Sequence, residues 1–311
     1  MSSAEFSLIQ TFVREFDAPR APTGPGDDCA VLPPTAGDLC VTTDAVVEGV
    51  HFSLAHFRFE DIGHKALAVN LSDLAAMGAS PSWFLCSLGL PRRFGKREVS
   101  ALGKGMSALA RVHRMRLVGG NISAARELWV SLTAAGEVPP GQALTRAGGR
   151  SGDWLYVSGT LGEARLGLRL LGKGARTGFA KRQLRPVARV GLGQIARRFG
   201  RAAIDISDGL AQDLAHLCAA SGTGARVDVG RLPLHPAVRR MKEGIRWALA
   251  GGEDYELLIA IPPERGPRFE RECTKSGERV TRIGELTSTD TVAFGRAGKI
   301  IPSPPGFDHF E

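Results

Sequence analysis

The chain has 311 residues, which is long for one compact core and sufficient for two, so two domains are expected. Hydrophobic residues make up 43% of it, yet no apolar run reaches the roughly 18 residues of a bilayer-spanning helix and no secretory signal pattern opens it, so we expect a cytoplasmic protein without membrane contact. The formal net charge is +8, but only 6% of residues are aromatic and the basic residues lie among Leu and Gly, so nucleic-acid binding is not expected.

The first half of the chain alternates predicted helices and strands. Apolar residues at helical spacing predict three helices, over Glu5–Phe16, Asp61–Met77 and Lys96–Arg116. Short apolar runs predict four strands, over Leu39–Val41, Trp83–Leu90, Leu117–Val118 and Leu128–Val138. Two of these strands are expected to stop at polar residues, the first at Thr42-Thr43-Asp44 and the third at Gly119-Gly120-Asn121. The order indicates an α+β layer.

The Pro139-Pro140-Gly141 cluster predicts the domain boundary, giving an N-terminal domain over 1–138 and a C-terminal domain over 139–311. In the second domain the pattern predicts helices over Gly162–Leu171, Val187–Phe199, Leu210–Ala220 and Glu264–Lys275. Strands are predicted over Asp153–Val157, Ala202–Ile206, Ala225–Val229, Glu256–Ile261, Arg279–Leu286 and Thr291–Phe294.

A basic stretch, Arg165 to Arg201, holds eleven Arg and Lys residues and no acid, and we expect it to form a solvated or anion-attracting face. Its middle, from Gly172 to Pro186, is predicted to be irregular. The five cysteines are an odd number without CxxC spacing, which favours reduced thiols over a disulfide framework or a zinc site.

Oxygen-bearing side chains occur at five widely separated places in the sequence, most of them at predicted strand ends and each beside Gly, Ser or Thr. Each turn alone has an ordinary explanation as a structural cap. Together they suit a hard cation, because magnesium prefers oxygen ligands, keeps several waters and accompanies polyphosphates. The five places are Asp27-Asp28, Asp44, Asp73, Asn121, and Asp205 with Asp208.

Motifs for other phosphate and acyl chemistries are absent from the sequence. There is no Walker lysine motif, no kinase glycine-rich loop and no dinucleotide fingerprint. Neither Ser nor Cys lies at a Gly-x-Ser-x-Gly elbow, so a nucleophilic triad is not indicated. Magnesium-assisted chemistry on a polyphosphate therefore remains the main hypothesis.

The chain resembles the thiamine-monophosphate kinase family, within the superfamily of aminoimidazole ribonucleotide synthetase. The resemblance runs from Glu5-Phe6 to the tail Gly306–Phe310 and rests on Gly26–Ala30, Thr43-Asp44 with Gly49–Phe52, Lys65–Ala79, Ala143–Arg146, Ile204–Leu210 and Gly251–Leu257. It implies a two-domain α+β fold, with an N-terminal sheet that pairs across a homodimer and a C-terminal α/β sandwich domain.

The resemblance also implies a reaction and a set of site residues. The reaction is ATP-dependent phosphorylation of thiamine monophosphate to thiamine diphosphate, the last step of thiamine diphosphate biosynthesis, with ATP in a magnesium-lined cleft. Carried over by position, Mg2+ would be held by Asp28, Thr42, Thr43, Asp44, Asp73, Asp205 and Asp208; ATP would be contacted by Gly120, Asn121, Arg146 and Ser207; and thiamine monophosphate would be contacted by His51, Glu253 and Phe307.

One position departs from the family pattern. Where Gly-Gly-Asp-Thr is expected, this chain has Gly-Gly-Asn-Ile-Ser, so Asn121 can offer a metal an amide oxygen but no charge. The role of one magnesium ion, and whether Asn121 binds it, stays open. The adenine contacts are open as well.

The implied chemistry needs no nucleophilic residue, because the attacking phosphate oxygen is already an anion and the obstacle is repulsion between two polyanions. Direct in-line transfer without a phosphoenzyme is expected.

The alternative functions are another ATP-dependent synthase of the superfamily, of the selenophosphate or aminoimidazole ribonucleotide type, or a catalytically silent nucleotide-binding module. Single residues also keep bland alternatives: a structural His51, a solvated Arg146, a Phe307 that only anchors the tail, and an exposed Glu253-Asp254 turn.

Overall fold

The computed structural model describes residues 4–18, 23–25, 29–296 and 299–302. Two predicted site residues, Asp28 and Phe307, lie outside these described residues, as does Asp27. The chain divides into two compact units: unit 1 comprises residues 1–74 and 80–141, and unit 2 comprises residues 75–79 and 142–311. Within the described part of the chain, no helix is both long enough and apolar enough to cross a membrane.

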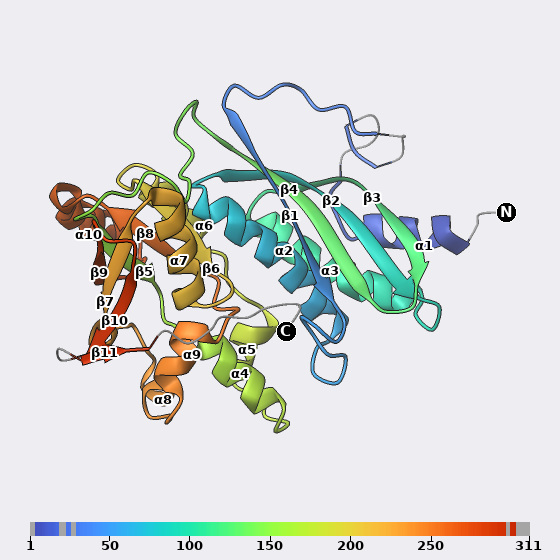
Figure 1. Ribbon diagram of the computed structural model, residues 1–311. Coiled ribbons are helices and arrows are strands. Elements are labelled where there is room, and N and C mark those ends of the chain that lie inside the picture. The colour runs from blue at the N-terminus through green and yellow to red at the C-terminus, as the bar shows by residue number, and fades with distance from the viewer. Residues whose placement is uncertain (1–3, 19–22, 26–28, 297–298, 303–311) are drawn as a thin grey trace. The chain divides into compact units, whose positions relative to one another are not determined.

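Unit 1 is built on a four-stranded sheet in the order β1-β4-β2-β3. Its strands are β1 (Asp38–Val47), β2 (Ser80–Pro91), β3 (Arg116–Ala125) and β4 (Trp129–Val138). β2 and β3 run parallel, whereas β4 pairs antiparallel with both β1 and β2. The helices are α1 (Ala4–Val13), α2 (Phe59–Ala76) and α3 (Lys96–Val112), and α2 and α3 lie along one face of the sheet (Figure 1).

Side chains alternate between the two faces of this sheet, as strand geometry requires. On β2, Phe84, Cys86 and Leu88 are buried, whereas Leu85 between them is exposed. On β1, Leu39 and Val41 are also exposed. The sheet therefore has one buried face and one face that carries exposed apolar side chains.

Two of the predicted strand ends in unit 1 are wrong. β1 continues through Thr42-Thr43-Asp44 to Val47, because β4 pairs with it residue by residue from Asp38 to Val47 and satisfies its main-chain groups. β3 likewise continues past Gly120 to Ala125 beside β2. Long-range strand pairing here outweighs the local preference of Gly, Asp and Asn for turns.

Unit 2 contains a seven-stranded sheet in the order β11-β10-β7-β9-β5-β8-β6. Its strands are β5 (Trp154–Ser158), β6 (Ala202–Ile206), β7 (Gly224–Asp228), β8 (Glu256–Ile261), β9 (Val280–Thr287), β10 (Val292–Arg296) and β11 (Lys299–Ile301). The helices are α4 (Glu163–Leu171), α5 (Gly178–Leu184), α6 (Val190–Ala196), α7 (Leu210–Ser221), α8 (Pro236–Arg239), α9 (Gly244–Ala250) and α10 (Gly266–Lys275), with short 3-10 turns at Val229–Arg231 and Pro263–Arg265.

Both faces of the second sheet are covered by helices. Leu155 and Val157 on β5 belong to the same core cluster as Leu214 on α7. Tyr156 between them points the other way: its hydroxyl donates to Glu270 Oε1 of α10 at 2.7 Å, and its ring meets Phe269. Unit 2 is thus a helix–sheet–helix sandwich, and the predicted α+β fold with a C-terminal α/β sandwich is confirmed (Figure 1).

The structure corrects the prediction for the middle of the basic stretch, which is not wholly irregular. Residues Gly178–Leu184 form helix α5, whose first turn is capped by the Thr177 hydroxyl accepting the Ala180 N–H at 3.4 Å. The sequence pattern also did not predict α8, α9 and β11, which are short. The helix that begins at Lys96 was predicted to extend to Arg116, which is too long. That helix ends at Val112, followed by Arg114 in a left-handed conformation with φ 54°.

Candidate functional site

In unit 1, one predicted pair of metal ligands is in direct contact. The Thr42 hydroxyl on β1 donates to Asp73 Oδ2 on α2 at 2.5 Å. This hydrogen bond fixes the position of both groups relative to each other. Asp73 is half-buried on a helix whose neighbouring residues are buried, so its carboxylate has a defined place at the edge of the core.

The two residues after Thr42 point in opposite directions. Asp44 lies two residues from Thr42 on the strand and so shares its face. It is exposed, and its Oδ1 accepts the Ala45 N–H at 2.7 Å. Thr43 lies on the other face, and its hydroxyl donates to the Leu132 carbonyl of β4 at 2.9 Å. The structure therefore brings Thr42, Asp44 and Asp73 together on one side and leaves Thr43 out.

His51 follows β1 in a turn that a buried lysine holds in place. The His51 Nδ1 accepts the Val47 N–H at 3.1 Å, which leaves Nε2 as the ring nitrogen that can donate a hydrogen bond. The His51 carbonyl accepts from Lys65 Nζ at 2.8 Å. Lys65 is only 1% exposed, and its ammonium lies over the Phe57 ring. The imidazole is thus fixed through both its ring and its main chain.

Gly120 and Asn121 lie on β3, at the opposite edge of the sheet from β1. Gly120 has φ 159° and no room for a side chain, since a Cβ would lie 2.0 Å from the Cys86 carbonyl oxygen. Asn121 is exposed, and its Nδ2 donates to Ser123 Oγ at 2.9 Å. Two strands separate it from Asp44, so unit 1 does not bring these two predicted metal ligands together.

In unit 2, three carboxylates meet where β6 passes into α7. Asp205 is buried near the end of β6, and Asp208 lies two residues after the last residue of that strand. Asp213, in the first turn of α7, accepts the N–H groups of Asp208 and Gly209 at 3.2 and 3.1 Å. Burial, together with the negative charges of Asp205 and Asp208, raises the pKa of Asp213 to about 8. This concentration of negative charge would be relieved by a cation.

The loop 251–255, which precedes β8, is hydrogen-bonded to this acidic turn. The Glu253 N–H donates to the Ser207 carbonyl at 2.6 Å, and the Tyr255 N–H donates to the Ile206 carbonyl at 2.8 Å. Glu253 and Tyr255 have left-handed backbone conformations, with φ 61° and 49°. Such conformations are costly for residues other than glycine and persist only where the surroundings enforce them, as they do here.

The Glu253 and Asp254 side chains diverge, so they do not form the exposed turn kept open as an alternative. The Gln183 side-chain amide donates to Glu253 Oε2. Asp254 accepts the Gly162 N–H at 2.7 Å and the Ala164 N–H at 3.3 Å, and so caps the N-terminus of α4. Burial raises the pKa of Asp254 from 3.8 to about 7 despite these two donors.

A pH-dependent contribution to stability follows from Asp254. A raised pKa means that the folded state holds this proton more tightly, so the contribution is complete below about pH 4 and is lost as the pH rises through about 7. In Asp254→Asn, whose amide oxygen can still cap α4, this loss should disappear. Urea unfolding of both proteins at several pH values tests it: the wild type should lose stability relative to the variant between these limits, and parallel profiles would contradict the assignment.

Behind the loop, the first residue of β8 belongs to a buried ion pair. Glu256 is 2% exposed and receives two hydrogen bonds from the Arg189 guanidinium, at 2.6 and 2.5 Å, and one from the Ser158 hydroxyl at 2.5 Å. Removing one partner of such a pair would leave a buried charge uncompensated. Arg189, from the basic stretch, therefore anchors the base of the loop.

Arg146 is not placed beside the acidic turn. Its carbonyl accepts from the Ser221 hydroxyl at 2.9 Å, which puts its main chain at the C-terminal end of α7. Asp208 lies at the other end of that 12-residue helix, about 18 Å away at the helical rise per residue. The Arg146 side chain is exposed.

The donor chemistry of these residues decides whether they suit magnesium. In the described ranges, no group of three or more His, Cys, Asp or Glu side chains forms a metal site by itself. Magnesium does not require one, because it is usually bound by one or two carboxylates with waters and substrate phosphates. The Thr42–Asp73 pair beside Asp44, and the Asp205–Asp208 turn, each offer hard oxygen donors of this kind, so both fit.

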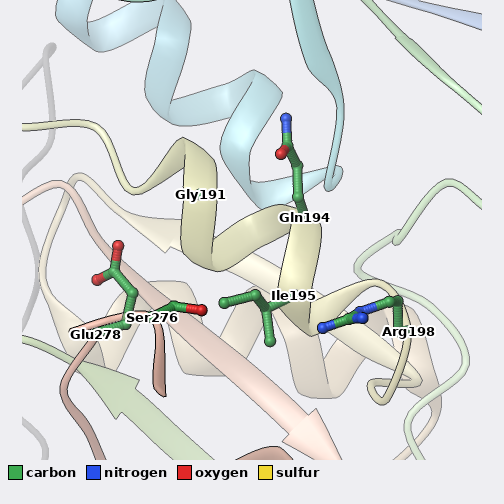
Figure 2. Close-up of a pocket in the computed structure, with 6 residues that line it drawn as sticks. All are labelled: Gly191, Gln194, Ile195, Arg198, Ser276 and Glu278. Carbon is green, nitrogen blue, oxygen red and sulfur yellow. The ribbon is translucent and has the colours of Figure 1, made fainter. Parts of the chain in front are cut away.

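A separate hollow of about 330 Å³ lies on unit 2, against α6 and the turn after α10. Figure 2 shows Arg198 and Glu278 on opposite sides of Ile195 there. None of the predicted site residues lines it, so we assign it no part in the site.

Four supporting side chains were missed by sequence reasoning. Asp213 lies five residues after Asp208, where it resembles any acid in a first helical turn. Lys65 is a single cation at the start of an apolar helical run. A cation in such an apolar setting indicates that its ammonium group is buried and has a hydrogen-bond partner. Asp254 and Gln183 gave no signal beyond their residue types.

Comparisons with known proteins agree with this geometry. Residues 26–138 match the family model described as AIR synthase related protein, N-terminal domain, and residues 150–295 match the corresponding C-terminal domain. The thiamine-monophosphate kinase of Salmonella typhimurium is 40% identical over 328 aligned residues, which cover 100% of this chain and 99% of that protein. The chain belongs to the thiamine-monophosphate kinase family.

Solved structures of the family extend the likeness to three dimensions. The crystal structure of thiamine-monophosphate kinase from Stenotrophomonas maltophilia K279a matches with a TM-score of 0.83 at 38% identity, over 96% of this chain and 98% of that one. A structure described as AaThiL complexed with AMPPCP and TMP matches with a TM-score of 0.80 at 34% identity, over 100% of this chain and 99% of that one. Family membership and fold therefore agree along the whole chain.

Proposed function

We propose that this chain transfers the γ-phosphoryl group of ATP to thiamine monophosphate and releases thiamine diphosphate and ADP. The observation that carries the proposal is the 40% identity to a thiamine-monophosphate kinase along the full length of both proteins. The relative that was solved with AMPPCP and TMP supports both substrates, since AMPPCP is an analogue of ATP. ATP as co-substrate also favours a cytoplasmic enzyme.

We assign the oxygen-rich groups of both units to magnesium and ATP. In unit 1, Thr42, Asp44 and Asp73 would hold Mg2+, with Thr42 fixing the Asp73 carboxylate. In unit 2, Asp205 and Asp208 would hold Mg2+, and Asp213 fixes the turn that carries them. When bound, magnesium would neutralise phosphate charge and favour in-line transfer.

The remaining assignments concern the two substrates. From the family resemblance, and not from proximity in the structure, we assign Gly120, Asn121, Arg146 and Ser207 to ATP, with Asn121 a neutral donor where the family pattern has a carboxylate. From the family resemblance we assign His51 and Glu253 to thiamine monophosphate, and hydrogen bonds hold both side chains in place. Asp28 and Phe307 keep their expected roles, metal and substrate binding, as proposals outside the described residues.

Transfer should be direct, because the acceptor phosphate is already anionic and needs no nucleophilic side chain. After incubation with γ-labelled ATP, no stable label should remain on the denatured protein. Label that survives denaturation would show a phosphoenzyme and contradict direct transfer.

We also propose that two copies pair through the exposed face of the unit 1 sheet. Val41 and Leu85 are 55% and 37% exposed on that face, beside Leu39, and burial of such a patch is a strong driving force for association. Val41→Glu should shift sedimentation from dimer to monomer. Val112→Glu is the matched control, because Val112 is 72% exposed on α3 and not on that face. A dimer unaffected by Val41→Glu would exclude this interface.

A coupled assay of ADP release tests the function. Wild-type protein with ATP and magnesium should release ADP only when thiamine monophosphate is added, and not with thiamine alone. Tight ATP binding without any turnover would favour the silent nucleotide-binding alternative, which the neutral Asn121 motivates.

A further inference from the structure

The inference concerns helix α5 in the basic stretch, which is fixed rigidly onto α4. A Cβ on Gly167 of α4 would lie 2.2 Å from the Phe179 carbonyl oxygen, so the α5 backbone packs directly on that glycine. Near its other end, the Arg182 Nε donates to Glu163 Oε2 at 3.1 Å. The opposite oxygen of Glu163 accepts from the Thr160 hydroxyl at 2.9 Å. These contacts leave α5 little freedom to shift.

Gln183 comes from this fixed helix to the loop 251–255. It is 3% exposed, which is unusual for a side chain whose amide oxygen and amide nitrogen both need hydrogen-bond partners, and its amide donates to the Glu253 carboxylate. A buried amide is retained where it makes hydrogen bonds, because leaving its polar atoms unpaired is costly. The observed partner is a side chain assigned above to the substrate.

The loop itself is tied to α4 as well as to α5. Asp254 caps the N-terminus of α4, while Glu253 reaches Gln183 on α5 and its main chain bonds to Ser207. The strained backbone at Glu253 means that the carboxylate cannot reach this place by local preference alone. The helix pair therefore sets where the Glu253 carboxylate lies.

We propose that Gln183 is a positioning residue for thiamine monophosphate: it holds the Glu253 carboxylate in the orientation that binds the positively charged thiazolium ring of the substrate. A carboxylate that is already fixed loses less conformational freedom when the substrate binds, so affinity increases. This inference rests on the proposed function and gives the acid-free basic stretch a role, which is to carry the support of the substrate loop.

The test is steady-state kinetics of Gln183→Met, which keeps the length and removes the donor. The KM for thiamine monophosphate should rise roughly tenfold, as expected for loss of one hydrogen bond to a charged group. The KM for ATP, kcat and Tm should stay close to wild type. Gln194→Met is the matched control: Gln194 is half-buried on α6 in the same stretch, and Figure 2 shows it pointing away from Ile195 and Glu278. An unchanged KM for thiamine monophosphate would overturn the proposal.

A double-mutant cycle separates positioning from general stability. If Gln183 acts through Glu253, then Gln183→Met should add much less to the KM in a Glu253→Gln background than in the wild type. Equal effects in both backgrounds would overturn the proposal.

If Gln183→Met lowers the Tm strongly, Gln183→Asn replaces it, because that variant keeps the amide but is too short to reach Glu253. Wild-type protein without thiamine monophosphate-dependent ADP release would refute the function, whereas normal wild-type kinetics with unaffected variants would refute only this inference.

Discussion

Asp44→Asn should lower phosphoryl transfer by at least roughly 100-fold, because the change removes a charge that we assign to magnesium at the reacting phosphates. The free energy of unfolding should change by less than about 0.5 kcal/mol, since Asp44 is exposed and contributes little packing. The measurement is kcat as a function of magnesium concentration, with urea unfolding in parallel.

Asp290→Asn is the matched control for this variant. It makes the same chemical change at an exposed aspartate between β9 and β10. No predicted site residue lies in that loop. Asp290→Asn should behave as wild type. Near-normal turnover of Asp44→Asn at limiting magnesium would show that the metal assignment for β1 is wrong.

Gly209→Ala should destabilise the protein by about 2–4 kcal/mol and reduce turnover as well. Gly209 has φ 117°, and a Cβ there would lie 2.7 Å from Ala250 Cα and 2.8 Å from the Leu249 carbonyl oxygen. The end of α9 would have to move, and the turn that carries Asp208 would move with it. Chemical unfolding and kcat are the two measurements.

Gly222→Ala separates packing from backbone strain. Gly222 lies at the other end of α7 with φ 64°, but a Cβ there would meet nothing within 4 Å. It should therefore cost only the left-handed strain, about 1 kcal/mol, and leave kcat unchanged. Equal losses of stability in the two variants would contradict the argument that close packing of α9 holds the acidic turn.

The acidic turn of unit 2 shows what local sequence can predict. A buried strand, two carboxylates and a glycine before a helical pattern were enough to place Asp205 and Asp208 at the junction of β6 and α7, where the structure has them. The glycine is informative because its conformation and lack of space both exclude a side chain. Each of these signals lies within a few residues, so no long-range knowledge was needed.

The same reasoning failed where distant segments decide the structure. The local sequence predicts that a strand ends at Thr42-Thr43-Asp44. Pairing with β4, about 90 residues further along the chain, instead extends β1 through these residues, and Thr43 pairs with Thr133. That extension alternates the side chains, which separates Thr43 from Thr42 and Asp44. The role of Gln183 could not be predicted from the sequence, because only the tertiary contact with Glu253 distinguishes it from an ordinary polar residue in the basic stretch.

The most direct test of the account is a phosphorus NMR spectrum of one reaction that contains the wild-type protein, ATP, magnesium and thiamine monophosphate. The account predicts that thiamine diphosphate and ADP form in equal amounts, with no accumulation of inorganic phosphate. ADP and inorganic phosphate with unchanged thiamine monophosphate would show a simple ATPase, and would contradict the central claim that the chain phosphorylates thiamine monophosphate.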